Sequence, residues 1–449
     1  MKHTRFFVVA LALLGLASCE SVVDGLNVDP NNFTEISTNL LISQGVLNLA
    51  SIAESEPARI AGMWTDQFSG SDRQYITQDN YGVADADFDN IWIDLYQRGY
   101  TQADIAEAQA VAENSPPREG VAQILKGYYA AEAALMFGDV PFTEVNDEKI
   151  LDPVYDPQQD VLSGAIALLD AGKAKAGSFP VTASNISSNL GQILNSSATW
   201  GQFADALKAR YLLAQRDYPG ALAAAQDAAF DDPSASVDIA HSAVNFSENL
   251  FFQFEAEQRT DYLTFDGSYL IRMLSDTTDV SRTDAKTDDS ARRAFFMRVN
   301  GSGFDGLNVS RDGFFAADRN FPVIGYPEVQ LIIAECALRT GDTPAAIAAL
   351  NNARNYWDGL TGTDNYQDYE ASDFADDDAL LEAILKEKFA SVFGLPTMYD
   401  IIRTNNLIGT DLDGRNAPVQ RFLYPAVEAS SNSNFPGAKS LDDPTPINM

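Results

Sequence analysis

The sequence predicts a mostly α-helical fold, in which helical hairpins form a scaffold that carries long irregular loops within a single large domain. Three observations lead to this prediction. Apolar residues recur at helical spacing in several segments, two segments repeat one hairpin pattern, and two other stretches lose the helical spacing. No Gly/Ser-rich or low-complexity linker interrupts residues 35–449, so we expect them to form one domain.

Apolar stripes of helical period mark the clearest helices. One stripe contains Val121, Ile124, Leu125 and Tyr128, and two others lie within residues 329–337 and 347–357. We expect further helices near residues 36–53, 57–69, 89–113, 158–174, 200–216 and 378–393. Cys336 belongs to the second stripe and is therefore predicted to be a buried structural thiol, because reactive thiols need an accessible, electropositive setting.

Residues 212–228 and 337–353 look like two copies of one hairpin. They read LLAQRDYPGALAAAQDA and ALRTGDTPAAIAALNNA, and in each a proline follows an aspartate by two residues, at Pro219 and Pro344. A proline in the first turn and an Ala-rich second helix are typical of tetratricopeptide-type hairpins, whose small residues let helices pack closely. Two independent hairpins with similar turns remain the alternative, because the full signature of about 34 residues is absent.

Helical spacing fades near residues 69–88 and in a loop-rich insertion at about 231–325. Long irregular loops on a rigid frame are where binding residues concentrate. Aromatic faces cover the apolar C–H surface of sugars, and polar groups meet their hydroxyls. The candidate ligand-binding residues chosen on this basis are Arg73, Tyr75, Asp79, Tyr81, Tyr262, Phe265, Asp266, Tyr269 and Phe314. The alternative for each loop aromatic is that it only fixes its own loop. Trp92, Tyr96 and Trp357 have the spacing of core residues instead.

The first 34 residues have the layout of a lipoprotein signal and tether. Lys2 and Arg5 precede an apolar run at residues 6–16, and Leu16-Ala17-Ser18-Cys19 resembles a bacterial lipobox. We therefore expect residues 1–18 to be a signal peptide, Cys19 to carry lipid and residues 19–34 to be an extended tether. An ordinary signal peptide that happens to be cleaved before a cysteine is the alternative.

Charge and histidine content exclude several classes of function. The net charge of -34 repels phosphate backbones and anionic lipid, so we expect no nucleic-acid partner and membrane contact only through the lipid anchor. The chain has 2 His, and His3 would leave with the signal peptide, which leaves His241. Catalysis or metal binding that needs several histidines is therefore excluded.

Acidic residues leave two further possibilities open. Asp85, Asp87 and Asp89 alternate as at the start of a calcium loop, but Asn90 and Tyr96 occupy the positions where an EF-hand needs Gly and Glu. We expect no cofactor, although a looser structural calcium site is possible. The 64 Asp and Glu residues also permit a glycosidase or lyase, but nothing singles out a catalytic pair.

Several pieces of the chain, in order, resemble the SusD/RagB family of outer-membrane nutrient-binding lipoproteins. They are Cys19 and residues 29–31, 92–96, 217–219, 325–329, 331–335, 384–389, 400–404 and 421–425. One departure is Phe393-Gly394-Leu395-Pro396, which stands where the family frequently has Glu-Gly before an Asp-x-x-Arg element. The departure points to a divergent branch of the family.

The resemblance implies a tetratricopeptide-like scaffold on the outer face of the outer membrane, held there by the lipid on Cys19. It also implies capture of oligosaccharides, or of peptides in some branches, and their delivery to a SusC-like, TonB-dependent transporter. It implies no catalytic activity. A surface glycoside hydrolase or lyase and a purely structural lipoprotein are the remaining alternatives.

Overall fold

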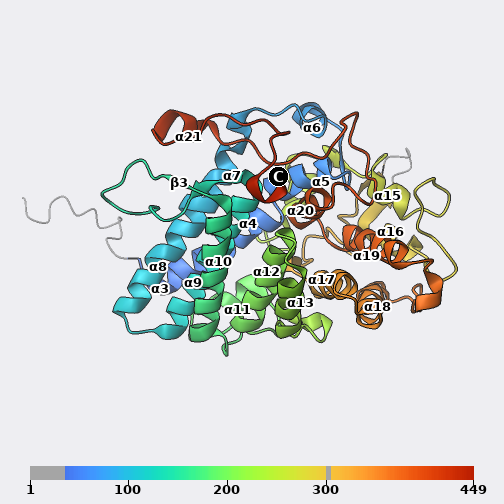
Figure 1. Cartoon of the computed structure of the whole chain (residues 1–449), viewed down its shortest axis with the longest axis horizontal. Helices are drawn as coiled ribbons and strands as arrows, with labels where there is room; N and C mark the ends of the chain where they lie inside the picture. The colour runs from blue at the N-terminus through green and yellow to red at the C-terminus, as the bar shows by residue number, and fades with distance from the viewer. Residues whose placement is uncertain (1–35, 300–304) are drawn as a thin grey trace, which may run out of the picture.

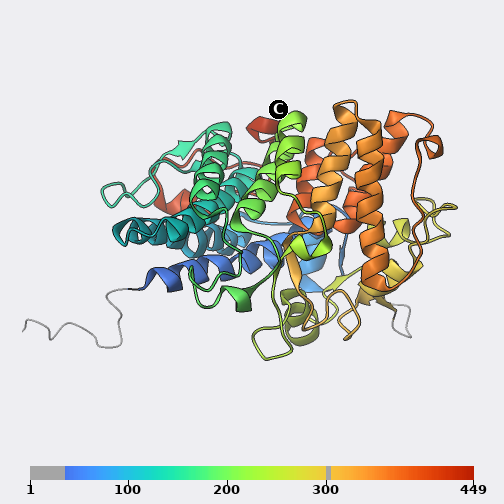
Figure 2. The ribbon, with the colours of Figure 1, turned by 90° about the horizontal axis from the view of Figure 1, so that it is seen from below.

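The computed structural model describes residues 36–299 and 305–449, and within them the fold is mostly helical, as predicted. The predicted signal peptide, Cys19 and the tether lie outside these residues. The main helices stand side by side in a row from α8 (Thr101–Ala112) to α18 (Thr343–Thr361), seen from two sides in Figures 1 and 2. The loop-rich segment lies mainly below this row in Figure 2.

Consecutive helices of the row pack against one another. Between α8 and α18 the row contains α9 (Pro116–Phe137), α10 (Gln158–Ala176), α12 (Trp200–Ala214), α13 (Tyr218–Asp227) and α17 (Tyr326–Arg339), and α19 (Asp377–Ser391) packs on α17. The helices α9 and α10 approach closely where glycines face each other. A Cβ atom on Gly120 would lie 2.7 Å from the carbonyl oxygen of Gly172.

The repeated hairpin is present at both predicted places, as α12–α13 and α17–α18. The second helix of each copy begins with the same type of N-cap. The Asp217 carboxylate accepts a hydrogen bond from the Gly220 amide at 3.0 Å, and the Asp342 carboxylate accepts one from the Ala345 amide at 3.1 Å. An aspartate that accepts from a first-turn amide, followed by a proline in that turn, is a strong helix start. The tetratricopeptide-like prediction is confirmed.

Two predicted helices are divided in the structure. The first becomes α3 (Thr38–Leu47) and α4 (Leu49–Ala53), which meet at Asn48, whose side-chain amide donates to the Asp94 carbonyl at 2.8 Å. The second runs from α7 (Asp89–Ile93) through a π-helical segment (Asp94–Tyr100) into α8. The wider turn brings Gly99 against the ring of Tyr129, where a Cβ atom would lie 2.5 Å from the nearest ring carbon.

The first loop is partly helical, contrary to prediction. It contains α6 (Arg73–Asp79), whose start is capped by Asp72, and a 3₁₀ helix (Asp85–Phe88). The loop-rich insertion contains short elements: β5 (Val237–Ile239), α14 (Leu250–Phe252), a π-helical turn (Gln253–Gln258), β6 (Leu263–Thr264), α15 (Tyr269–Met273), α16 (Ser290–Phe296), β7 (Met297–Val299), β8 (Asp305–Leu307) and β9 (Phe321–Ile324). The remaining α-helices and strands are α5 (Glu56–Trp64), β1 (Ser69–Gly70), β2 (Val140–Pro141), β3 (Tyr155–Asp156), α11 (Leu190–Ile193), β4 (Leu194–Asn195), α20 (Leu395–Arg403) and α21 (Ala426–Ser431).

Two small sheets fix the loops to the scaffold. One has the order β1-β6-β8-β7, and its antiparallel pair Ser69↔Thr264 joins the two loop regions that the sequence analysis singled out. The other has the order β4-β5-β9, with Asp238 opposite Pro322. The strand β9 leads directly into α17, so this second sheet anchors the start of a hairpin helix.

Aromatic side chains fill the space between loops and scaffold. Phe393, just before α20, stacks on Phe68 with ring centroids 5.7 Å apart and lies 5.3 Å from Phe314. Trp92 and Trp357 are 6% and 1% exposed, which confirms the prediction that they are core residues. None of the helices within residues 36–299 and 305–449 is long and apolar enough to cross a membrane.

Candidate functional site

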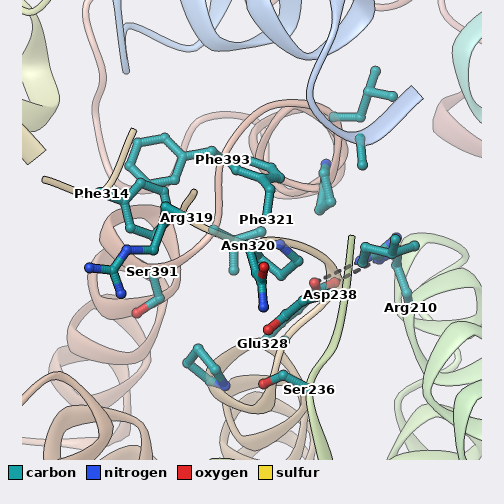
Figure 3. Close-up of a pocket in the computed structure, with 18 of the residues that line it drawn as sticks. Arg210, Ser236, Asp238, Phe314, Arg319, Asn320, Phe321, Glu328, Ser391 and Phe393 are labelled. Atoms are coloured by element: carbon teal, nitrogen blue, oxygen red, sulfur yellow. Dashed lines mark hydrogen bonds and ion pairs between the residues drawn. The ribbon is translucent and has the colours of Figure 1, made fainter. Parts of the chain in front are cut away.

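A cavity of about 240 Å³ opens where the second sheet meets the row of helices. Its lining comes from α4, α9, α12, α17 and α18, from β5 and β9, and from the segments at 314–323 and 391–396. Phe314 and Phe393 lie on one side of it and Arg210 on the opposite side (Figure 3). Asp318 is exposed, and Tyr356 and Leu360 are partly exposed, so these three residues mark the mouth.

The base of the cavity is a buried charged network. The Arg210 guanidinium donates Nε to Glu328 Oε1 and Nη2 to Glu328 Oε2, both at 2.7 Å, and also contacts the Val323 carbonyl at 2.6 Å. Glu132 accepts hydrogen bonds from the hydroxyls of Tyr399 at 2.7 Å and Tyr211 at 3.1 Å. Burial raises the pKa of Glu132, while Arg210 and these hydroxyls oppose the shift. Because these groups form hydrogen bonds and ion pairs with one another, they shape the cavity floor and need no ligand as a partner.

Asp238 differs from these carboxylates. It lies on β5, and its side chain lines the cavity. In the part of the chain that the structure describes, no donor hydrogen bonds to its carboxylate and no cation pairs with it. Burial raises the pKa of Asp238 to about 7. A partly buried carboxylate that lines a cavity and lacks a protein partner is a common feature of binding and catalytic sites.

The wall of the cavity is aromatic and rigid. Trp357 donates its indole N–H to Ser391 Oγ at 3.0 Å, and Arg292 lies 4.0 Å from the centroid of its ring system. Tyr356 packs edge-on against Trp357, with centroids 5.2 Å apart. Because these contacts fix the rings in place, the partly exposed Tyr356 can present an aromatic face to a ligand without reordering.

A shallow groove of about 480 Å³ adjoins the cavity and shares Tyr356 and Leu360 with it. Its other lining residues are Pro233, Tyr326, Asn352, Asn355 and Gly359. The rings of Tyr326 and Tyr356 lie 6.0 Å apart at 35°, beside the exposed amides of Asn352 and Asn355. An enclosed end pocket that continues into an aromatic and amide-lined groove suits an elongated, hydroxyl-rich ligand.

The candidate residues of the first loop have structural partners. Arg73 is exposed, and the buried Tyr75 hydroxyl accepts from Arg59 Nε at 2.9 Å. Asp79 accepts from the Gly70 amide at 2.9 Å, and Tyr81 lies beneath the Arg415 guanidinium at 4.7 Å. Burial raises the pKa of Asp79 to about 7.

The candidate residues of the insertion are mostly buried. Phe265 is fully buried against Phe68, Tyr262 packs 6.0 Å from Tyr75, and the Tyr269 hydroxyl donates to the Ile408 carbonyl at 2.7 Å. Asp266 is exposed. The structure thus brings the two loops together through Tyr75 and Tyr262, and it places Phe314 apart from them, in the cavity lining. The role of all nine as ligand contacts stays a prediction.

Several cavity residues were missed by the sequence analysis. Tyr356 lies within a stripe that predicts only a helix, and Asp238 lies in a three-residue strand with no motif around it. Arg210 and Glu328 carried a signal that could have been used. Each is a charged residue among apolar neighbours in a predicted helix, where a charge usually needs a buried partner.

Asp85, Asp87 and Asp89 do not converge on one point. Asp87 accepts from the Ala84 amide at 2.8 Å, and Asp89 accepts from the Val427 amide at 3.1 Å. Within residues 36–299 and 305–449, no group of three or more His, Cys, Asp or Glu is placed to hold a metal ion. The structural calcium site stays untested.

Cys336 is fully buried in α17, and burial raises the pKa of its thiol to about 12. We expect a soluble form that begins at Glu20 to show almost no reaction with a thiol-specific reagent in the native state. In denaturant the same thiol should react fully, because the thiolate is the reactive species and needs access. Absorbance of the released reagent measures both rates. Rapid labelling of the folded protein would contradict the structural role.

A model of the SusD-like family, described as "Starch-binding associating with outer membrane", matches residues 30–395. No curated protein matches the chain. Solved structures show the same fold at low identity. A SusD homologue from Bacteroides thetaiotaomicron is 14% identical with a TM-score of 0.68, over 92% of this chain and 99% of that one. A chitin-binding SusD homologue from Flavobacterium johnsoniae is 15% identical with a TM-score of 0.64, over the same shares of the two chains.

Proposed function

Because the chain belongs to the SusD-like family, we propose that it is a non-catalytic lipoprotein of the outer-membrane surface that binds a nutrient oligosaccharide. In this proposal Cys19 carries the lipid, and a SusC-like, TonB-dependent transporter receives the bound glycan. The observation that supports glycan binding most directly is the cavity that continues into the groove across Tyr356. Starch binding in the description of the family agrees with this class of ligand.

The chemistry of the cavity fits binding better than hydrolysis. Glycosidases use two carboxyl groups that are free to exchange protons with the substrate or with water. Glu328 is held by Arg210, and Glu132 is held by two tyrosine hydroxyls. His241 also has a partner, because its Nε2 lies 2.8 Å from Glu54 Oε1. Among the described cavity residues two carboxyls, Asp238 and the exposed Asp318 at the mouth, have no such partner, so the search for product in the titration below tests binding against hydrolysis.

We expect the soluble form from Glu20 to bind one class of oligosaccharide saturably in calorimetric titrations, with no product after long incubation. The panel contains neutral and charged oligosaccharides and peptides. Tyr356→Ala should weaken binding about tenfold, because an aromatic face on the ligand contributes on the order of 0.5–1.5 kcal/mol beyond buried area.

Tyr81→Ala is the matched variant, since Tyr81 is also a half-buried tyrosine but lies on the loop surface outside the cavity lining. It should leave the affinity unchanged. If Tyr81→Ala abolished binding and Tyr356→Ala did not, the ligand would bind at the loops that the sequence analysis singled out. If only peptides bound saturably, the proposed ligand would be a peptide instead of a glycan. Product formation would contradict the non-catalytic proposal.

A further inference from the structure

Asp238 is held in the cavity by the sheet around it. The strand β5 lies between β4 and β9, so Asp238 is opposite Asn195 on one side and Pro322 on the other. Pro322 has no backbone N–H to offer, and it lines the same cavity. The carboxylate therefore sits at a fixed place with unused acceptor capacity. Asp238 is partly buried and unpaired, so its carboxylate is free to accept a hydrogen bond and a positive charge from a ligand.

The charged groups that line the cavity leave Asp238 without a counter-ion. Arg210 on α12 is bonded to Glu328 on α17 and lies 3.7 Å from Glu132 on α9. Arg319 lies over the ring of Phe295, 5.2 Å from its centroid. Asp318 adds another negative charge at the mouth. The described lining thus holds more carboxylates than guanidinium groups, and the guanidinium groups have other contacts.

The aromatic ring of Tyr356 lines the same cavity as this carboxylate. Burial and, after it, the charge of Asp238 raise the pKa of Tyr356, which places the tyrosine within the electrostatic reach of the carboxylate. Trp357 packs against Tyr356 on the same wall. A cavity that is lined by both an unpaired carboxylate and an aromatic ring can bind an ammonium group through an ion pair and cation–π attraction.

We propose that the cavity recognises an ammonium group on the ligand, with Asp238 as its counter-ion and Tyr356 as the neighbouring aromatic face. This inference rests on the proposed function, because it names the chemistry of the ligand for the same cavity. An ammonium group can belong to an amino sugar with a free amine or to the lysine side chain of a peptide. Acetylation of the amine removes the charge in both cases.

The probes are a glucosamine tetramer and a lysine-containing tetrapeptide, each beside its N-acetylated counterpart, titrated at pH 7. We expect at least one free-amine probe to bind tenfold or more tightly than its acetylated form. Asp238→Asn should abolish this preference by lowering the affinity for the free-amine form. Asp318→Asn is the matched control, since Asp318 is the exposed cavity acid, and it should change the preference less than about threefold.

Proton release gives a second measurement that does not depend on a variant. Burial raises the pKa of Asp238 to about 7, and a bound cation stabilises its charged form. The lysine amine, with a pKa of about 10.4, stays charged throughout. Calorimetry in two buffers of different ionisation enthalpy should therefore show release of a fraction of a proton per bound tetrapeptide. Glu132, Glu328, Asp318, Arg210, Arg319 and Tyr356 also face the cavity, so the release must vanish in Asp238→Asn for it to be assigned to Asp238.

The outcomes separate this inference from the proposed function. Equal binding of free-amine and acetylated glucosamine tetramers, still dependent on Tyr356, would overturn ammonium recognition and leave glycan binding intact. Tight binding of the lysine peptide alone would keep ammonium recognition and replace the glycan by a peptide. If the amine preference persisted in Asp238→Asn, or if no proton were released by the wild type on peptide binding, Asp238 would not be the counter-ion. Absence of binding by every probe would overturn ammonium recognition, and the wider panel of oligosaccharides and peptides would then decide the proposed function.

Discussion

Arg210→Met is expected to lower the free energy of unfolding by about 3–5 kcal/mol. The substitution removes a guanidinium that forms two hydrogen bonds with Glu328, and the two side chains are only 6% and 3% exposed. Glu328 and Glu132 would then share the cavity base without a cation. Breaking one member of a buried pair is costly, because the remaining charge is neither hydrated nor paired. Equilibrium unfolding in urea, followed by circular dichroism, measures the loss.

Lys208→Met is the matched control on the same helix. Lys208 pairs with Asp170 at 2.8 Å, but the Asp170 side chain is 50% exposed, and exposed pairs contribute about 0–1 kcal/mol. We also expect Arg210→Met combined with Glu328→Leu to be less destabilised than the sum of the two single variants, since the double change removes both partners. A loss below about 1 kcal/mol for Arg210→Met would mean that the network does not hold α12 against α17.

The helical scaffold could be predicted because its signal is local. The stripes around Tyr128, Cys336 and Trp357 need only a few turns of sequence to be recognised, and all three segments are helical. The divisions at Asn48 and at the π-helical segment could not be predicted in this way. They depend on tertiary contacts, the Asn48 amide with the Asp94 carbonyl and Gly99 with the Tyr129 ring. The start of α6 was missed because Asp72 was taken as a loop residue instead of a cap.

The cavity could not be predicted because it is assembled from distant segments. Arg210 and Glu328 are separated by 118 residues, and only the packing of two hairpins brings them together. The loop aromatics were chosen because an irregular sequence suggests exposure. In the structure Phe265 and Tyr269 instead anchor their loops in the core, as the alternative stated for them allows. Phe314 reaches the cavity lining beside α18, where its ring centroid lies 6.3 Å from that of Trp357.

Gly394→Ala is expected to lower the free energy of unfolding by about 2–5 kcal/mol and to disturb the cavity wall. Gly394 precedes α20 with φ 78° and ψ -130°, a backbone conformation that residues with a Cβ rarely adopt. An added Cβ would also lie 2.9 Å from both Cα and Cβ of Ala58 on α5. The backbone amide of Gly394 donates to Gln67 Oε1 at 3.0 Å, so the turn cannot shift without breaking a buried hydrogen bond. Urea unfolding and ligand titration measure the two effects.

Gly359→Ala provides the control, because Gly359 lies in the helix α18 and an added Cβ there meets no atom within 4 Å. That variant should be more stable than the wild type by about 0.5–1 kcal/mol, since alanine favours the helix over glycine. The Gly394 variant should also affect the cavity, because Phe393, the preceding residue, lines it. The strained turn positions this ring between Phe68 and Phe314, so relaxation of the backbone would move one side of the cavity. Unchanged stability of Gly394→Ala would show that α5 and α20 can separate freely, and the rigid wall inferred for the cavity would then have no support at this point.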